Sequence, residues 1–299
     1  MQTVMMNAYG PSSVLAAAEV ATPTLLPKQV LVEQRATAID PYDVKFRAGE
    51  YGTEKPTPLI PGSSVAGVIV ALGSAVTDWQ IGDRVAANRH LQSDAQLVPI
   101  AARLLAKIPD NVSFETAAAV ALSGQTAWQM ITKDLNIQAD EQVLILGGAG
   151  SVGLLATQIA LQRGAKVSAS ASGDHVEKLQ HIAPLAQVFD YKSTSIDELS
   201  TTFDAVLDTV GGATLAQALA VTKPTGRVVS IAGESDDVRV RHAFLTSDGA
   251  QLQDLLAALA DDEFIVPIAD TAAFNVENLR AFHDRSVVVH DFGKLVLTF

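Results

Sequence analysis

Residues 143–157, VLILGGAGSVGLLAT, decide the fold of this chain. The first four residues are apolar and predict a buried strand, and the residues after Gly153 predict a helix. Between them, Gly148, Gly150 and Gly153 match the pattern G-x-G-x-x-G in the strand–turn–helix setting that gives the pattern its meaning. The stretch therefore indicates a dinucleotide-binding turn, and a plain glycine-rich turn in a parallel-sheet protein is the alternative.

The glycines have separate physical roles in this interpretation. Gly148 permits the turn, Gly150 lets a diphosphate approach the backbone, and Gly153 lets the helix pack against the strand. A diphosphate needs backbone N–H donors at a helix N-terminus with no side chain in the way. We therefore expect the main-chain amides around the turn to hold it, namely those of Ala149, Ser151 and Val152.

Apolar runs alternate with helical stretches on both sides of this turn, which predicts a doubly wound parallel sheet, a Rossmann fold, with right-handed crossovers. The expected strands are residues 143–146, 166–170, 187–190, 203–208 and 227–232, and the expected helices are residues 117–131, 152–163, 174–181 and 213–220. Ser113-Phe114-Glu115-Thr116 resembles a capping box before the first of these helices.

The chain before residue 110 has a different texture, with short strands separated by proline and glycine. This pattern predicts a compact β-rich domain, a distorted barrel. Strands are expected at 29–35, 65–72, 84–87, 96–100 and 294–299, and helices at 249–260 and 276–286. The expected domains are 1–119, completed by 268–299, and 120–267.

Composition limits the function. The 299 residues include 21 Lys and Arg against 33 Asp and Glu, a formal charge of -12, which argues against nucleic acid as a partner. There is no cysteine, which excludes disulfides, thiol chemistry and thiolate-based zinc sites. The six histidines show no metal-ligand spacing, and most are expected at the surface. No metal site is expected.

Residues 142–162 carry no charge and are long enough to span a bilayer, but they include four glycines and Gln158. We interpret them as part of a soluble protein without a membrane partner. Met1-Gln2-Thr3-Val4 has no charged segment followed by an apolar run, so a cytoplasmic location is expected.

The second strand of the sheet favours NADPH over NADH. An NAD site usually has an acidic residue about 20 positions after the glycines, but here the strand ends in Ser170 and Ser172. Small hydroxyls can donate to a 2′-phosphate that a carboxylate would repel, and Lys178 lies one helical turn further on. Lys178 as a solvated helix lysine is the alternative, and Asp174 reaching the ribose 2′-hydroxyl would reverse the preference.

Several ordered motifs together resemble the medium-chain dehydrogenase/reductase superfamily, and within it the zinc-free quinone oxidoreductase and enone (alkenal) reductase branch. The resemblance covers essentially the whole chain. It is carried by residues 40–49 (DPYDVKFRAG), 61–69 (PGSSVAGVI), 81–86 (IGDRVA), 126–129 (TAWQ), 148–153, 208–212 (DTVGG) and 293–297 (GKLVL).

The resemblance implies a GroES-like barrel domain made of the N-terminal part and the C-terminal tail, with a Rossmann domain inserted between them. It places the active site in the cleft between the domains and implies a homodimer. Because the chain lacks the cysteine ligands of zinc-dependent relatives, it implies direct hydride transfer from NADPH to a small electrophilic substrate, a quinone or an α,β-unsaturated carbonyl compound.

Carried over to residues 40–49, the resemblance places Lys45 near the nicotinamide and the substrate carbonyl, where its charge could stabilise an enolate. A surface helix lysine is the alternative. Asp40 stands where the family has asparagine, and it is expected either to pair with Lys45 or to alter substrate tolerance. Tyr51 matches a tyrosine of the substrate cleft, or it is a packed barrel tyrosine.

On the cofactor side, Thr126 resembles the residue near the carboxamide, and Tyr191 resembles a tyrosine near the adenosine ribose phosphate. Further cofactor contacts are expected from strand ends and from the C-terminal motif, at Val210, Ile231, Ala232, Gly233 and Lys294. Asp208 could equally form a turn.

Three functions remain open on the sequence. The first is an NADPH-dependent, zinc-independent reductase of activated double bonds or quinones. The second keeps the fold and prefers quinones. The third is an NADPH-binding protein with little turnover. Initial rates on the two substrate classes separate the first two, and tight NADPH binding without substrate-dependent oxidation would indicate the third.

Overall fold

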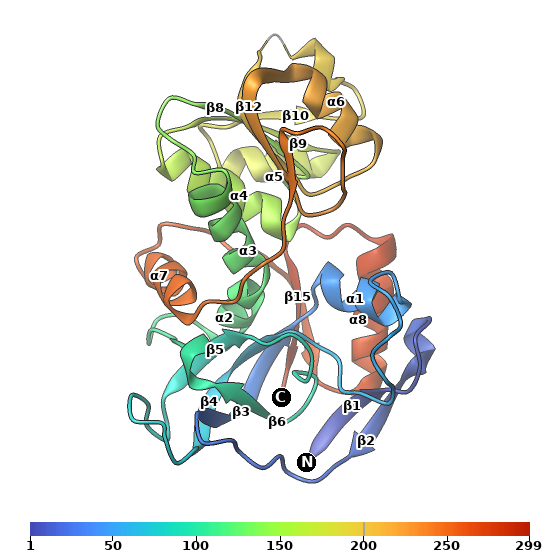
Figure 1. Ribbon diagram of the computed structural model, residues 1–299, viewed down its shortest axis with the longest axis vertical. Coiled ribbons are helices and arrows are strands. Elements are labelled where there is room, and N and C mark those ends of the chain that lie inside the picture. Colours follow the sequence, from blue (N-terminus) through green and yellow to red (C-terminus); the bar gives the residue numbers. More distant parts are fainter. Residues whose placement is uncertain (200) are drawn as a thin grey trace. The chain divides into compact units, whose positions relative to one another are not determined.

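The computed structural model describes residues 1–199 and 201–299, and within them the chain forms two compact units (Figure 1). The first unit contains Met1–Gln125 and Ser247–Phe299, and the second contains Thr126–Thr246. No helix in these described ranges combines the length and apolarity needed to cross a bilayer.

The second unit is built on a sheet of six parallel strands in the order β10-β9-β8-β11-β12-β13. This is the Rossmann order, in which the first strand along the chain lies centrally and the order reverses beside it. The strands are β8 (Gln142–Leu146), β9 (Lys166–Ala171), β10 (Gln187–Asp190), β11 (Phe203–Asp208), β12 (Thr222–Ser230) and β13 (Val240–His242). The expected doubly wound sheet is confirmed.

Helices cover this sheet and explain its continuous apolar strands. The unit contains α4 (Ser151–Gln162), α5 (Asp174–Ile182) and α6 (Ala213–Val221). Strand β8 is buried from Val143 to Leu146, as expected for a strand covered on both faces. Phe203, Leu215 and Phe189 pack into the same core, so helix packing fixes the strands whose ends carry the site.

The first unit contains a seven-stranded, mostly antiparallel sheet and a two-stranded hairpin. Strand β3 pairs with β4, β6 and β15, and irregularities in its register with β4 increase the local twist that lets the sheet coil. The strands are β1 (Gln2–Met6), β2 (Leu15–Glu19), β3 (Gln29–Ala38), β4 (Ser64–Leu72), β5 (Arg84–Asn88), β6 (Leu97–Ala101), β7 (Ala106–Lys107), β14 (Ile268–Ala273) and β15 (Lys294–Thr298).

The helices of the first unit are α1 (Pro41–Ala48), α2 (Phe114–Ala121), α7 (Gly249–Ala260) and α8 (Val276–Val288), and α3 (Ser123–Gln129) crosses into the second unit. Helices α1 and α8 lie side by side, and both chain ends belong to this unit (Figure 1). Phe46 of α1 and Phe282 of α8 share one apolar core with Leu297 of β15. Strand β15 is thereby fixed next to the start of α1.

The structure divides differently from the expected domain limits. Residues 247–267 belong to the first unit, because α7 packs on β5 and β7. The helix expected over 117–131 is three segments, α2, α3 and a π-helical stretch, Met130–Asp134. The Ser123 hydroxyl donates to the Ala119 oxygen four residues earlier, a serine bond that often bends helices, and the Gln125 side chain donates to the Ala121 oxygen. Ser113 caps α2 as expected, accepting from Thr116 N.

Candidate functional site

The turn between β8 and α4 has the geometry of an anion cradle. Two bonds fix its backbone, since Gly150 N donates to the Gly147 oxygen within the turn at 3.0 Å and Gly148 N donates to the Ser170 oxygen of β9 at 2.8 Å. The first amides of α4 lack intrahelical acceptors and carry the positive end of the helix dipole. Gly150 is exposed and Ala149, Ser151 and Val152 are partly exposed, so the turn is open to solvent.

Each glycine of the pattern meets a different demand. A Cβ on Gly153 would lie 2.1 Å from the Gly147 oxygen, and one on Gly148 would lie 2.9 Å from the Ala169 Cβ. A Cβ on Gly150 would meet only the Gly147 oxygen, at 3.3 Å. Packing therefore explains Gly148 and Gly153, whereas Gly150 leaves free the space through which a diphosphate would approach the amides. The turn fits a dinucleotide.

The ends of β11 and β12 are held together by Asp208 and Ser230. The buried Asp208 carboxylate accepts from the amides of Val210 and Gly211 and from the Ser230 hydroxyl at 2.6 Å. Ser230 Oγ accepts from the amides of Ala232 and Gly233, at 3.2 and 3.0 Å. Asp208 thus forms a turn, and Ser230 is a positioning residue that sequence reasoning missed.

The residues held by this network lie at the carboxyl ends of β11 and β12, at the same edge of the sheet as the glycine turn after β8. The Val210 side chain is exposed, and Ile231, Ala232 and Gly233 are partly exposed. In an open parallel sheet, ligands bind outside the carboxyl ends of the strands, next to the point where the strand order reverses. These positions therefore remain candidates for cofactor contact.

The expected 2′-phosphate residues lie at the ends of β9 and β10, in three different environments. Ser170 is buried, and its hydroxyl accepts from Gly147 N at 2.9 Å, so it also supports the glycine turn. Ser172 is partly exposed and Tyr191 is exposed. Lys178 bonds Asp174 at 2.6 Å, and this bond lowers the pKa of Asp174. Thr126 is buried at the start of the second unit.

In the first unit, Asp40 forms an ion pair with Lys294 and does not pair with Lys45. Asp40 is 0% exposed and Lys294 is 4% exposed. The Lys294 ammonium donates to Asp40 Oδ1 and, at 2.8 Å, to the Ile39 oxygen, while Ser64 donates to Asp40 Oδ2 at 2.9 Å. The expected pairing of Asp40 with Lys45 is wrong, because Lys294 at the start of β15 is held against the start of α1. The cofactor contact expected of Lys294 stays a prediction beside this pair.

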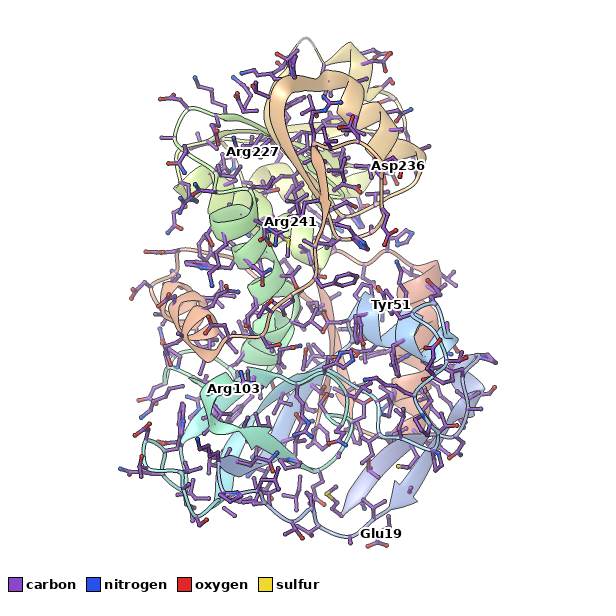
Figure 2. The ribbon with its side chains drawn as sticks, in the orientation of Figure 1. Glu19, Tyr51, Arg103, Arg227, Asp236 and Arg241 are labelled. Carbon is purple, nitrogen blue, oxygen red and sulfur yellow. The ribbon has the colours of Figure 1, made fainter. Side chains whose placement is uncertain are left out.

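Lys45 lies on α1, partly exposed. Among the residues that the structure describes, its ammonium makes no hydrogen bond or ion pair, so it is available to an anionic or carbonyl oxygen. Tyr51 lies just beyond the end of α1 (Figure 2), where its ring stacks on Tyr42 with centroids 5.2 Å apart. Partial burial raises the pKa of Tyr51.

Two further carboxyls are buried near this helix. Asp43 accepts from the Ser63 hydroxyl and from Asp40 N, and burial together with Asp40 and Asp94 raises its pKa well above the usual range. Burial raises the pKa of Asp94 to about 7. Asp43 therefore joins the start of α1 to the loop at Ser63, and burial works against the charge of both Asp43 and Asp94.

Arg47 and His283 join α1 to α8. Arg47 Nε donates to His283 Nδ1 at 3.2 Å, and its guanidinium donates to the Gly10 oxygen. Burial lowers the pKa of His283 to about 3, so it is neutral at physiological pH. His283 is fully buried, unlike the surface position expected for most histidines. Across residues 1–199 and 201–299, no group of three or more His, Asp or Glu side chains could hold a metal ion.

A Rossmann sheet with an open glycine turn, joined to a coiled β domain, defines a dinucleotide-binding protein of the dehydrogenase type. Comparison with known families agrees. The family model described as alcohol dehydrogenase GroES-like domain matches residues 26–110, and the model described as zinc-binding dehydrogenase matches residues 151–265.

Among curated proteins, the chain is similar to an NADPH-dependent alkenal/one oxidoreductase, chloroplastic, from Arabidopsis thaliana, with 34% identity over 85% of this chain and 68% of the relative. Among solved structures it is similar to the quinone oxidoreductase from Coxiella burnetii, with 26% identity and a TM-score of 0.89 over 100% and 99% of the two chains. A mycobacterial protein complexed with NADPH gives 26% identity and a TM-score of 0.89 over 100% of both chains.

The chain therefore belongs to the zinc-free quinone oxidoreductase and alkenal/one reductase branch of the medium-chain dehydrogenase/reductase superfamily. Both the Rossmann sheet and the GroES-like domain expected from the sequence are confirmed.

Proposed function

We propose that this protein is an NADPH-dependent oxidoreductase that reduces the activated double bond of an enone or enal, or a quinone, without zinc. The observation that carries the proposal is the glycine turn, where space beside Gly150 leaves the amides of α4 open to a diphosphate. The names of the relatives supply the substrate classes, an alkenal or enone for the Arabidopsis protein and a quinone for the Coxiella protein.

Residues of the second unit would hold the cofactor. The amides of Ala149, Ser151 and Val152 would bind the diphosphate, and the strand-end residues Val210 and Ile231 would lie along the remainder. Ser172 and Lys178 are the proposed donors to the 2′-phosphate. Since Lys178 already bonds Asp174, the pair offsets the charge of a carboxylate that would repel that phosphate.

NADPH, when bound, supplies a hydride to the electron-poor carbon of the acceptor. As the new C–H bond forms, the electron pair of the double bond moves toward the acceptor oxygen and leaves it negatively charged. We assign the binding of that oxygen to Lys45, because its ammonium has no competing carboxylate among the described residues. A preplaced positive charge stabilises this oxygen more in the transition state than in the ground state.

The test is a titration of the purified protein with NADPH and with NADH, followed by NADPH oxidation with quinones, enals and enones. Tighter binding of NADPH together with oxidation by at least one acceptor is the expected result. The absence of turnover with every acceptor would contradict the proposal and, if NADPH still bound, would favour the binding protein with little turnover. Faster turnover with quinones would favour the quinone-preferring form.

We also propose that the protein is a homodimer in the cytoplasm. Strand β13 is an edge of the Rossmann sheet, and exposed apolar side chains flank it, with Val238 100% and Phe244 61% exposed. An unpaired edge of this kind can add a second copy of itself. Light scattering of the wild type and of Val238→Glu tests the dimer, which the charge should weaken. Cell fractionation tests the location.

A further inference from the structure

We propose that Tyr42 and His90 form the proton route of this enzyme, with Tyr42 as the acid that protonates the acceptor oxygen. This inference rests on the proposed function, which leaves the source of the proton open. It begins from a contact in the first unit, where the Tyr42 hydroxyl lies 2.9 Å from His90 Nε2.

Tyr42 is placed beside the residue proposed to bind the acceptor. It lies three residues before Lys45 on α1, and residues three apart in a helix are neighbours on its surface. An ammonium that binds the developing oxyanion and a hydroxyl that can protonate it are therefore presented by the same part of one helix. Within the motif that resembles the family, Tyr42 had no assigned role.

Ring packing holds Tyr42 in position. Its ring stacks on Tyr51 at 5.2 Å and on the buried Phe46 at 6.1 Å, and the His90 ring lies 5.0 Å away. Such contacts restrict the rotation of the tyrosine while leaving its hydroxyl on His90. A fixed donor reaches its acceptor without the entropy cost of ordering a mobile one.

His90 is suited to resupply the proton. It remains exposed to solvent, yet the rings of Tyr42 and Phe46 pack beside it, and this partial burial lowers its pKa below the usual 6.5. The imidazole is then neutral at pH 7, with one nitrogen protonated and the other free to accept. With the proton on Nε2, the ring donates to the tyrosine oxygen and leaves Nδ1 for water.

The proton balance of the route is complete. The Tyr42 O–H bond breaks as the acceptor oxygen gains its proton, which gives an enol or a hydroquinone and a tyrosinate. Nε2–H of His90 then returns a proton to the tyrosinate, while Nδ1 takes one from solvent water. The net proton comes from water, no redox change occurs at either residue, and exchange with solvent restores the tautomer.

The test compares Tyr42→Phe and His90→Gln with Tyr9→Phe. Tyr9 is a matched control, since its ring lies 5.7 Å from Phe46 but its hydroxyl donates to the Lys55 carbonyl oxygen. We expect Tyr42→Phe to lower kcat by on the order of 100-fold and to increase the solvent deuterium isotope effect. We expect His90→Gln to lower kcat by about tenfold. The double variant should have the same kcat as Tyr42→Phe, because the two residues act as one unit.

The outcomes separate this inference from the function beneath it. Suppose that the wild type turns over and that Tyr42→Phe has the same kcat and isotope effect as Tyr9→Phe. This result would overturn the proton route and leave the proposed reductase function intact. Additive losses in the double variant would also overturn it. A wild type that oxidises no NADPH with any acceptor would overturn the proposed function itself. The fluorescence of Trp79, which packs against a core of the first unit, checks that the unit carrying the substitutions is folded in each variant, and His90→Gln keeps the test open should Tyr42→Phe not fold.

Discussion

Asp40 stands where the family has asparagine, and its buried ion pair with Lys294 predicts how the stability of the protein responds when either partner is replaced. The perturbation is Asp40→Asn, which restores that asparagine but leaves a buried ammonium with the Ile39 carbonyl and one amide oxygen as acceptors. Removing one partner of a buried pair typically costs about 3–5 kcal/mol. Lys294→Met leaves the opposite charge uncompensated.

The loss of stability in each single variant cannot exceed the free energy needed to neutralise the charged side chain that remains. Deprotonating an ordinary lysine at pH 7 costs about 4.6 kcal/mol, and protonating an ordinary aspartate costs about 4 kcal/mol. The penalty of Asp40→Asn should therefore shrink as pH rises, by up to about 1.4 kcal/mol per unit, whereas that of Lys294→Met should shrink as pH falls. The double variant has neither charge of this pair and should recover all but about 1–2 kcal/mol, since Ile39 O still lacks its donor.

The assay is urea unfolding at pH 6, 7 and 8, followed by the fluorescence of Trp79, which packs against the core of the first unit. A Trp128→Phe background removes the other tryptophan. Full stability of Asp40→Asn, or a double variant as weak as either single one, would refute the reasoning. A stable but inactive double variant would show that the pair is needed for activity as well as for stability.

Three further predictions concern the turn, the acceptor and the buried acid. Gly150→Ala should weaken NADPH binding at least tenfold in titration and leave the melting temperature unchanged. Gly153→Ala should lower the melting temperature, because its Cβ would lie 2.1 Å from a backbone oxygen. The reverse pattern would contradict the assignment of the diphosphate site to this turn. Lys45→Ala should reduce kcat/KM for enones by on the order of 100-fold, and more than for quinones, in steady-state kinetics; equal activity would remove its role. Because burial raises the pKa of Asp94 to about 7, the fold keeps a proton that the unfolded chain loses from about pH 4 upward. Unfolding free energy should therefore fall by about 3 kcal/mol between pH 4 and 7, and chemical denaturation should show a flatter profile for Asp94→Asn.

Short-range sequence patterns predicted the position of some helices and strands, and for others such patterns were present but were not used. The strand over 203–208 and the helix over 249–260 lie where periodicity predicts them. Helix α1 was not among the helices expected from periodicity, although Asp40, Pro41 and Gly49 mark its start and end. The bends after α2 were beyond reach, because they depend on which side chains bond to the backbone four residues earlier.

The candidate site divides in the same way. The glycine turn is local, since a diphosphate is bound by consecutive amides, and its function could be deduced from spacing alone. The partner of Asp40 could not, because Lys294 lies 254 residues away and pairs with it only after β15 is placed beside β3. The contact between Tyr42 and His90, 48 residues apart, is of the same kind.

The amino-acid sequence by itself determined the Rossmann sheet, the open phosphate turn and the family, because periodicity, glycine spacing and consecutive amides are properties of short stretches of chain. Only the tertiary structure decided which charges are paired, which hydroxyl meets which imidazole, and which lysine remains available. Those choices depend on burial and on distances between remote segments, and a side chain's chemistry follows from its neighbours after folding.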